Sequence, residues 1–120
     1  MKATELRIGN VLTFLDKQVT VVAITETHTS IKGYEFNRYT PVALNYKGLQ
    51  GIELTEEILL KFGFEQNTFG FKKGNIVFNY RFDNKFIPKL SDQCLLELKH
   101  VHQLQNLYFA LTGEELEVKL

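Results

Sequence analysis

The sequence predicts a single α+β domain over its 120 residues. Three observations support this fold class. β-Branched and apolar residues alternate with turn residues over the first 54 positions, residues 55–63 carry a short-helix signature, and residues 101–112 place apolar side chains at helical spacing. We therefore expect a β-rich part at 1–54, and a helix, an aromatic β-hairpin, a further strand and a C-terminal helix packed on the sheet at 55–120.

The β-rich part should open with a hairpin. Residues 6–24 are rich in Val, Leu, Ile and Thr and are interrupted by turn residues at positions 9–10 and again at 16–18. Residues 25–46 hold weaker extended pieces between turn residues such as Gly33 and Pro41. This pattern predicts a small barrel or meander.

A short helix is expected at residues 55–63. Thr55 suits the N-cap, Glu56 and Glu57 lie in the first turn, Lys61 lies in the last turn and Gly63 can end the helix. Neighbouring helical side chains point about 100° apart, so the two glutamates compensate the helix dipole and do not form a catalytic pair.

An aromatic hairpin is expected at residues 64–86, with its turn at 72–75. Alternation over residues 76–82 puts four side chains on one buried face and Arg81 on the other. These four are Ile76, Phe78, Tyr80 and Phe82. Residues 93–99 then form either a strand with Cys94, Leu96 and Leu98 inward or the first turns of a helix opened by Ser91, and the paired leucines favour the strand.

The C-terminal helix carries two different faces. One is an apolar stripe that should face the core: Val101, Leu104, Leu107, Tyr108 and Leu111. The other, the uncharged strip, consists of His102, Gln105, Asn106 and Phe109. Residues 101–112 contain no Asp, Glu, Lys or Arg, so we expect protein rather than water to cover this strip. The cover is the N-terminal β part, a second copy of the chain or a host protein.

Composition excludes several classes of protein. Fourteen basic residues balance fourteen acidic ones, so no overall field attracts nucleic acid or anionic lipid. No apolar run is long enough for a membrane span or a signal peptide, and Cys94, set among leucines, indicates a small buried hydrophobe in a reducing compartment. The expected location is the cytoplasm.

No motif indicates an enzyme or a cofactor. The sequence contains neither a glycine-rich phosphate loop nor a hydrolase or zinc-protease signature. His100 and His102 would share one face of a strand but diverge on a helix, and they lack further ligands nearby. We therefore expect no metal and no cofactor, and interpret these histidines as hydrogen-bonding groups at a strand-to-helix junction.

The aromatic hairpin also carries the candidates for a ligand or nucleic-acid site: Lys72, Lys73 and Arg81. Single-strand binders combine such cations with stacked aromatic side chains. Arg81, however, should point away from the aromatic face, so a buried core is favoured over an open stacking platform, and nucleic acid is an unlikely partner.

Three blocks of sequence resemble a family of small uncharacterised proteins encoded in bacterial genomes and prophages. They are LRIGN at residues 6–10, LTEEILLKFGF at 54–64 and HQLQNLYFALTGEEL at 102–116. The resemblance implies a phage or mobile-element setting and names no catalytic residue. The leading hypothesis is a non-enzymatic interaction module that acts through its C-terminal helix on a second copy or a host protein. The alternatives are a small-ligand or nucleotide-sequestering protein that opposes host defence signalling, and a weak single-stranded nucleic-acid binder.

Overall fold

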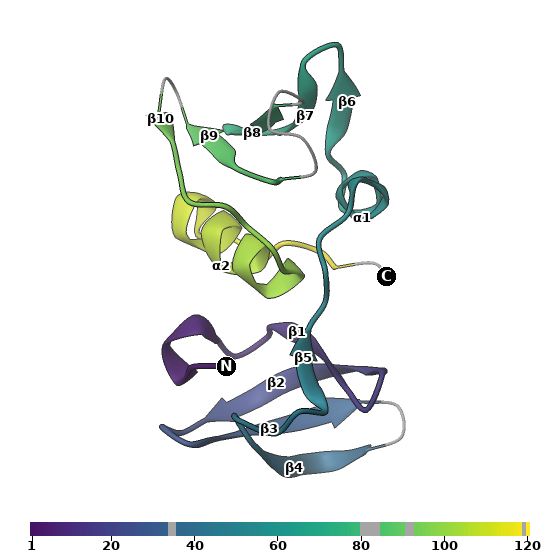
Figure 1. Ribbon diagram of the computed structural model, residues 1–120, viewed down its shortest axis with the longest axis vertical. Coiled ribbons are helices and arrows are strands. Elements are labelled where there is room, and N and C mark those ends of the chain that lie inside the picture. Colours follow the sequence, from purple (N-terminus) through teal and green to yellow (C-terminus); the bar gives the residue numbers. More distant parts are fainter. Residues whose placement is uncertain (34–35, 80–84, 91–92, 119) are drawn as a thin grey trace.

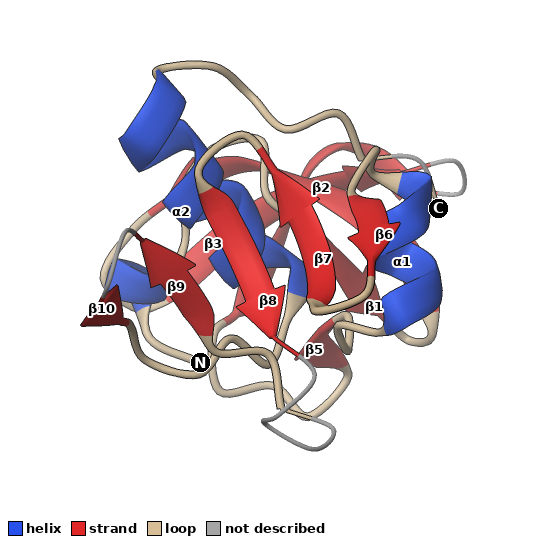
Figure 2. Ribbon diagram, turned by 90° about the horizontal axis from the view of Figure 1, so that it is seen from above, coloured by secondary structure: helices blue, strands red, loops and turns tan. Residues whose placement is uncertain are grey.

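The computed structural model has two antiparallel β-sheets with one long helix between them (Figure 1). It describes residues 1–33, 36–79, 85–90, 93–118 and 120. Figure 2 shows the same stacking from above, with the short helix α1 at the side of the molecule next to β6. The expected α+β class is confirmed.

The first sheet is formed by the N-terminal part and curls into a half-barrel, with strand order β4-β3-β2-β1-β5. A short 3-10 helix, Ala3–Glu5, precedes it. Its strands are β1 (Val11–Phe14), β2 (Lys17–Ile24), β3 (His28–Gly33), β4 (Phe36–Ala43) and β5 (Leu49–Gly51). Leu15 and Asp16 join β1 to β2 with φ of 51° and 65°, the left-handed backbone that a tight hairpin requires.

One face of this sheet encloses its own hydrophobic core. Its buried members are Leu6, Leu12, Val19, Val21, Ile31, Val42, Leu44 and Leu49. Val19 and Val21 are two residues apart in β2, so their side chains share one face of the sheet, as alternation in a half-buried strand requires. Leu12 in β1 is paired with Val19, and Ile31 in β3 is paired with Val21. The expected N-terminal hairpin is confirmed.

The short helix α1 (Glu56–Lys61) forms as its sequence predicts. The Thr55 hydroxyl accepts a hydrogen bond from the Ile58 backbone N–H at 3.2 Å, which satisfies one of the free amides at the N-terminus. Gly63 ends the helix with φ of 89°, a conformation that glycine adopts without steric cost.

The second sheet has the order β10-β9-β8-β7-β6. Its strands are β6 (Glu65–Asn67), β7 (Gly70–Lys73), β8 (Ile76–Asn79), β9 (Pro88–Leu90) and β10 (Gln93–Cys94). The expected hairpin is β7 and β8, with Gly74 in its turn at φ of 58°. Tyr80, Arg81 and Phe82 lie outside the described residues, so the face of the sheet on which each side chain lies stays a prediction.

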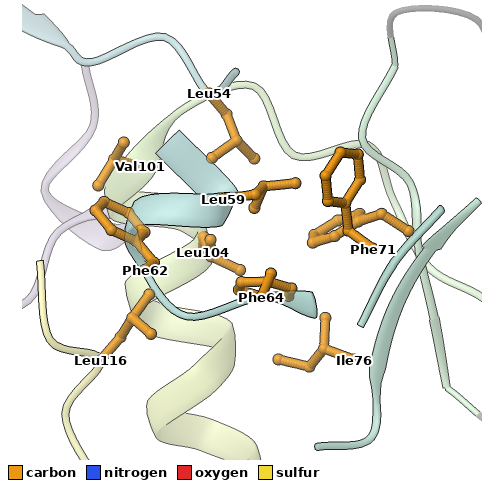
Figure 3. Close-up of a cluster of buried hydrophobic side chains, with 10 residues drawn as sticks. Leu54, Leu59, Phe62, Phe64, Phe71, Ile76, Val101, Leu104 and Leu116 are labelled. Atoms are coloured by element: carbon orange, nitrogen blue, oxygen red, sulfur yellow. The ribbon is translucent and has the colours of Figure 1, made fainter. Parts of the chain in front are cut away.

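The helix α2 (Val101–Thr112) closes a second hydrophobic core under this sheet (Figure 3). Buried side chains come from α1 and the residues that flank it, from α2, from the second sheet and from the C-terminal segment: Leu54, Leu59, Phe62, Phe64, Phe71, Ile76, Phe78, Val101, Leu104 and Leu116. Phe78 packs edge-on against Phe86, with ring centroids 5.8 Å apart. The aromatic hairpin is therefore core under a helix, as the alternation of Ile76 and Phe78 predicts.

Residues 93–99 correct one expectation. Helix is absent from this segment, but only Gln93 and Cys94 form a strand, and Leu98 makes an isolated bridge to Phe86. Cys94 is exposed and Leu96 is 87% exposed, so the inward orientation expected for both is wrong, whereas Leu98 packs against the core. The reason is that β10 is the last strand of its sheet, so its outer edge has no neighbouring strand among the described residues.

No helix within the described ranges is both long and apolar enough to cross a membrane.

Candidate functional site

Helix α2 joins the two halves of the molecule because its two faces pack on different sheets. The apolar stripe enters the second core through Val101 and Leu104, while Leu107 and Tyr108 are partly buried against it. Leu111, at the end of the helix, is 45% exposed, so the expectation that it faces the core is wrong. The uncharged strip faces the N-terminal part, where His102 and Gln105 are fully buried. The N-terminal part of the same chain therefore covers these two strip residues.

Two amide side chains of the strip bind backbone groups of the N-terminal part. Gln105 Oε1 accepts from the Val11 N–H at 2.8 Å, and Gln105 Nε2 donates to the Gly9 carbonyl at 3.1 Å. Asn106 Nδ2 donates to the Glu5 carbonyl at 2.9 Å. An uncharged amide supplies both a donor and an acceptor, which a buried backbone edge needs and a charged side chain cannot provide. This accounts for the absence of charge on the strip.

Asn10 is the partner of the strip that the sequence did not single out. Its side chain is fully buried, accepts from the Arg7 N–H at 2.8 Å and donates to Asn106 Oδ1 at 2.8 Å. The Gly9 backbone, with φ of 98°, makes the turn that brings Asn10 to the helix. The sequence predicts a turn at Gly9 and Asn10, but nothing local in it indicates that the turn docks on a helix 96 residues later.

At the C-terminal end of the strip, Phe109 is only partly covered. The guanidinium carbon of Arg7 lies 4.2 Å from the centroid of the Phe109 ring. The same guanidinium forms two hydrogen bonds to the Glu115 carboxylate, at 2.6 and 2.9 Å, and this bonding lowers the pKa of Glu115. Phe109 remains 38% exposed, so Arg7, Phe109 and Glu115 form a surface cluster held by an ion pair and a cation–π contact.

At the N-terminal end of α2, two imidazoles stack on each other. The His100 and His102 ring centroids are 5.4 Å apart with 13° between the planes. Gln103 Oε1 accepts from the backbone N–H groups of Lys99 and His100, which fixes the start of the helix. His100 is thus the residue before the helix, at the junction that the sequence predicts.

His102 does not form the hydrogen bonds that the sequence interpretation expected of it. Its side chain is 1% exposed, and neither ring nitrogen has a hydrogen-bond partner among the described residues. The pKa of His102 is lowered to about 4, mainly by burial and also by the neighbouring His100, while Glu5 acts in the opposite direction. The imidazole is therefore neutral at pH 7, with one donor and one acceptor unused.

Gly51 in β5 makes room for both rings. A Cβ atom at this position would lie 2.7 Å from His100 Cγ and 2.9 Å from His102 Cε1. The backbone also holds this corner, since the Val101 N–H donates to the Ile52 carbonyl at 2.8 Å and the Leu54 N–H to the Lys99 carbonyl at 2.9 Å. No sequence signal marked Gly51, because the close approach is between residues distant in the chain.

The hairpin candidates do not come together into one site. Lys72 is exposed on β7, whereas Lys73 lies beside the Tyr108 ring, with Nζ 5.9 Å from the centroid. Lys73 and Tyr108 line a small cavity of about 170 Å³ at the turn after β7. Arg81 lies outside the described residues.

Among the residues that the structure describes, no three His, Cys, Asp or Glu side chains are grouped so that they could hold a metal ion. Comparison of the chain with models of known protein families, with curated proteins and with solved structures finds no match.

Proposed function

We propose that the protein is a non-enzymatic interaction module of phage or prophage type that pairs with a second copy through the C-terminal end of α2. The observation that carries the proposal is the surface cluster of Arg7, Phe109 and Glu115. Phe109 presents an exposed aromatic ring on a rigid helix, and its neighbour Arg7 is held in one position by the Glu115 carboxylate.

Arginine and aromatic side chains are favoured at the centres of protein interfaces. Side chains that are already ordered lose less conformational entropy when a partner binds, and here the ion pair supplies that order. The cluster therefore has the composition and the rigidity of an interface centre.

The charges of the cluster favour a second copy as the partner. A two-fold axis brings a patch against itself, so each charge can meet the opposite charge of its neighbour. The cluster carries one positive and one negative side chain beside an aromatic ring, so it is complementary to itself. The buried members of the strip, His102 and Gln105, act within the chain and would not contact the partner.

Sedimentation velocity over a range of protein concentrations tests this function. The wild type should form dimers, and Phe109→Glu should remain a folded monomer, because the ring is partly exposed and its loss leaves no buried cavity. Leu60→Glu is a matched control, since Leu60 is also exposed and helical but lies on α1. A wild type that stays monomeric at high concentration, or dimers that survive in Phe109→Glu, would overturn the proposal.

A small-ligand function is the second candidate, and a specific observation favours it: a cavity of about 420 Å³ at the junction of the two halves is lined by His100 and His102. A nucleotide is a poor fit to this place, because the carboxylates of Glu5, Glu53 and Glu97 line it and Lys99 is the one lysine among its lining residues. A weak single-strand binder has less support, since Phe71 and Phe78 are buried and Phe69 is the exposed aromatic residue of the described hairpin.

A further inference from the structure

The two halves of the molecule are consecutive in sequence. Residues 1–51 form the first sheet and its core, and residues 52–120 contain α1, the second sheet and α2. The backbone at Gly51 and Ile52 joins them, and Figure 1 shows this connection rising from β5 toward α1. Among the described residues, no buried side chain belongs to both cores. The halves can therefore turn about this connection without disrupting either core.

The contact between the halves, which we call the seam, is mainly polar. Gln105 and Asn106 of α2 bond to backbone groups of the N-terminal half and to the Asn10 side chain. Arg7 reaches across to Glu115 with two hydrogen bonds. Polar contacts between structural units of one chain resemble transient interfaces and permit relative motion. Water can replace these hydrogen bonds, so opening the seam costs less than disrupting a core.

His102 is the buried seam residue that gains hydrogen bonds only when the seam opens. It is 1% exposed, and neither ring nitrogen is accessible or has a partner among the described residues. The ring stacks on His100 and approaches β5 so closely that a Cβ on Gly51 would lie 2.9 Å from its Cε1 atom. A protonated imidazole needs acceptors or water around it, and the closed seam provides neither.

The groups around His102 act on its proton in different directions. Burial is the largest influence and lowers the pKa of His102 to about 4, and the neighbouring His100 adds to the lowering. Glu5 acts in the opposite direction, and the amino group of Met1 lines the same cavity. Residues 49–51 of β5 contribute no titratable side chain. Burial thus outweighs the attraction of the one carboxylate, and the closed seam favours the neutral ring.

We propose that protonation of His102 opens the seam, so that the N-terminal half turns away from α2 as a folded body about Gly51 and Ile52. The opening exposes the face of α2 that carries Gln105 and Asn106. The closed form takes up the proton near pH 4, and the open form takes it up near pH 6.5. The ratio of open to closed chains should therefore rise about twentyfold between pH 7 and pH 5. This inference does not depend on dimer formation.

Native-state hydrogen exchange at pH 7 and pH 5 tests the opening. The Val11 N–H is the reporter, because it donates across the seam to Gln105. The Val21 and Phe64 amides are the comparison, since each bonds within one half, to Asn10 and to Leu59. After correction for the intrinsic exchange rate, the protection of Val11 should fall about twentyfold. Its exchange should also depend less on urea than that of Val21 and Phe64, because opening exposes less surface than unfolding.

Substitution of His102 separates its proton from other effects of acid. In His102→Gln the change in Val11 protection should be less than about twofold, because the variant has no proton to take up there. His28→Gln is the matched control, since it removes an exposed imidazole and should behave as the wild type. The other titratable bond of the seam favours the closed form at pH 5, because Arg7 lowers the pKa of Glu115.

Single-molecule energy transfer supplies a measurement that needs no change at His102. One dye is attached to the exposed Cys94 on β10 and the other to Lys32→Cys, on β3, at concentrations too low for dimers. A minor population of changed transfer efficiency should grow about twentyfold from pH 7 to pH 5, with an unchanged circular dichroism spectrum.

Three results would overturn the proposal. The first is a single transfer efficiency at both pH values. The second is one common opening free energy and urea dependence for Val11, Val21 and Phe64, which would mean that the halves separate only by unfolding. The third is an undiminished pH effect on Val11 in His102→Gln, which would assign the opening to another group.

Discussion

Protonation of His102 should destabilise the fold as the pH falls. The His102 imidazole is buried where α2 packs on the N-terminal part, and its pKa is lowered from 6.5 to about 4. In the unfolded chain the same ring is in water and takes up a proton near pH 6.5. The unfolded state therefore binds the proton at a higher pH than the folded state. The contribution of the neutral His102 to the free energy of unfolding is fully present above pH 6.5 and is lost as the pH falls toward 4.

The size of the effect follows from the difference in pKa. Each pKa unit corresponds to about 1.4 kcal/mol, so a depression from 6.5 to about 4 amounts to about 3.4 kcal/mol when the pH has passed below 4. Between pH 7 and pH 5 the loss is about 2 kcal/mol. This is a large part of the 5–15 kcal/mol by which a typical domain is stable.

Urea unfolding at a series of pH values measures this loss. Carboxylates also titrate in acid, so the informative quantity is the difference between the wild type and His102→Gln. The variant cannot take up the proton, and its free energy of unfolding should fall by about 2 kcal/mol less between pH 7 and pH 5. His28→Gln is the control, because it removes an exposed imidazole and should follow the wild type.

Equal pH slopes for the wild type and His102→Gln would refute the reasoning. The same conclusion would follow if NMR showed His102 titrating near pH 6.5 in the folded protein. Either result would mean that water or a protein group solvates the ring. A lower absolute stability of the variant would not affect the test, since the slope is the measurement.

Three further expectations concern the cores, the strip and metals. Phe78→Ala should lower the free energy of unfolding by about 3–5 kcal/mol in urea titrations, because the ring is buried in the second core. Phe69→Ala, which removes an exposed ring, should change it by less than about 0.5 kcal/mol, and similar losses in the two variants would contradict the assigned core. Gln105→Leu should cost about 1–3 kcal/mol by leaving the Val11 N–H without an acceptor, and an unchanged stability would show that this bond is replaced by water. EDTA should leave the melting temperature unchanged, and a lower value would reveal a structural metal.

Much of the secondary structure could be predicted from the sequence, because its signals are local. Thr55 and Gly63 bound α1 through a hydroxyl cap and a left-handed turn, and both depend on neighbours within a few residues. The alternation of Ile76 and Phe78 and the helical spacing of Val101 and Leu104 likewise fix which side of each element is apolar. The same reasoning predicts a covered strip on α2; this is confirmed for His102 and Gln105 and wrong for Phe109, which is 38% exposed.

The identity of that partner was decided only by the tertiary structure. Gln105 and Asn106 meet backbone groups of the turn at Gly9 and of Glu5, about a hundred residues earlier, and no local pattern encodes such a pairing. Cys94 and Leu96 are exposed for the same reason, because strand order determines which strand lies at the edge of the sheet. Only glycine fits at position 51 because β5 passes close to the imidazoles of His100 and His102. Periodicity determines which face of an element is buried, whereas only the docking of distant elements determines what buries it and which polar atoms are left without partners.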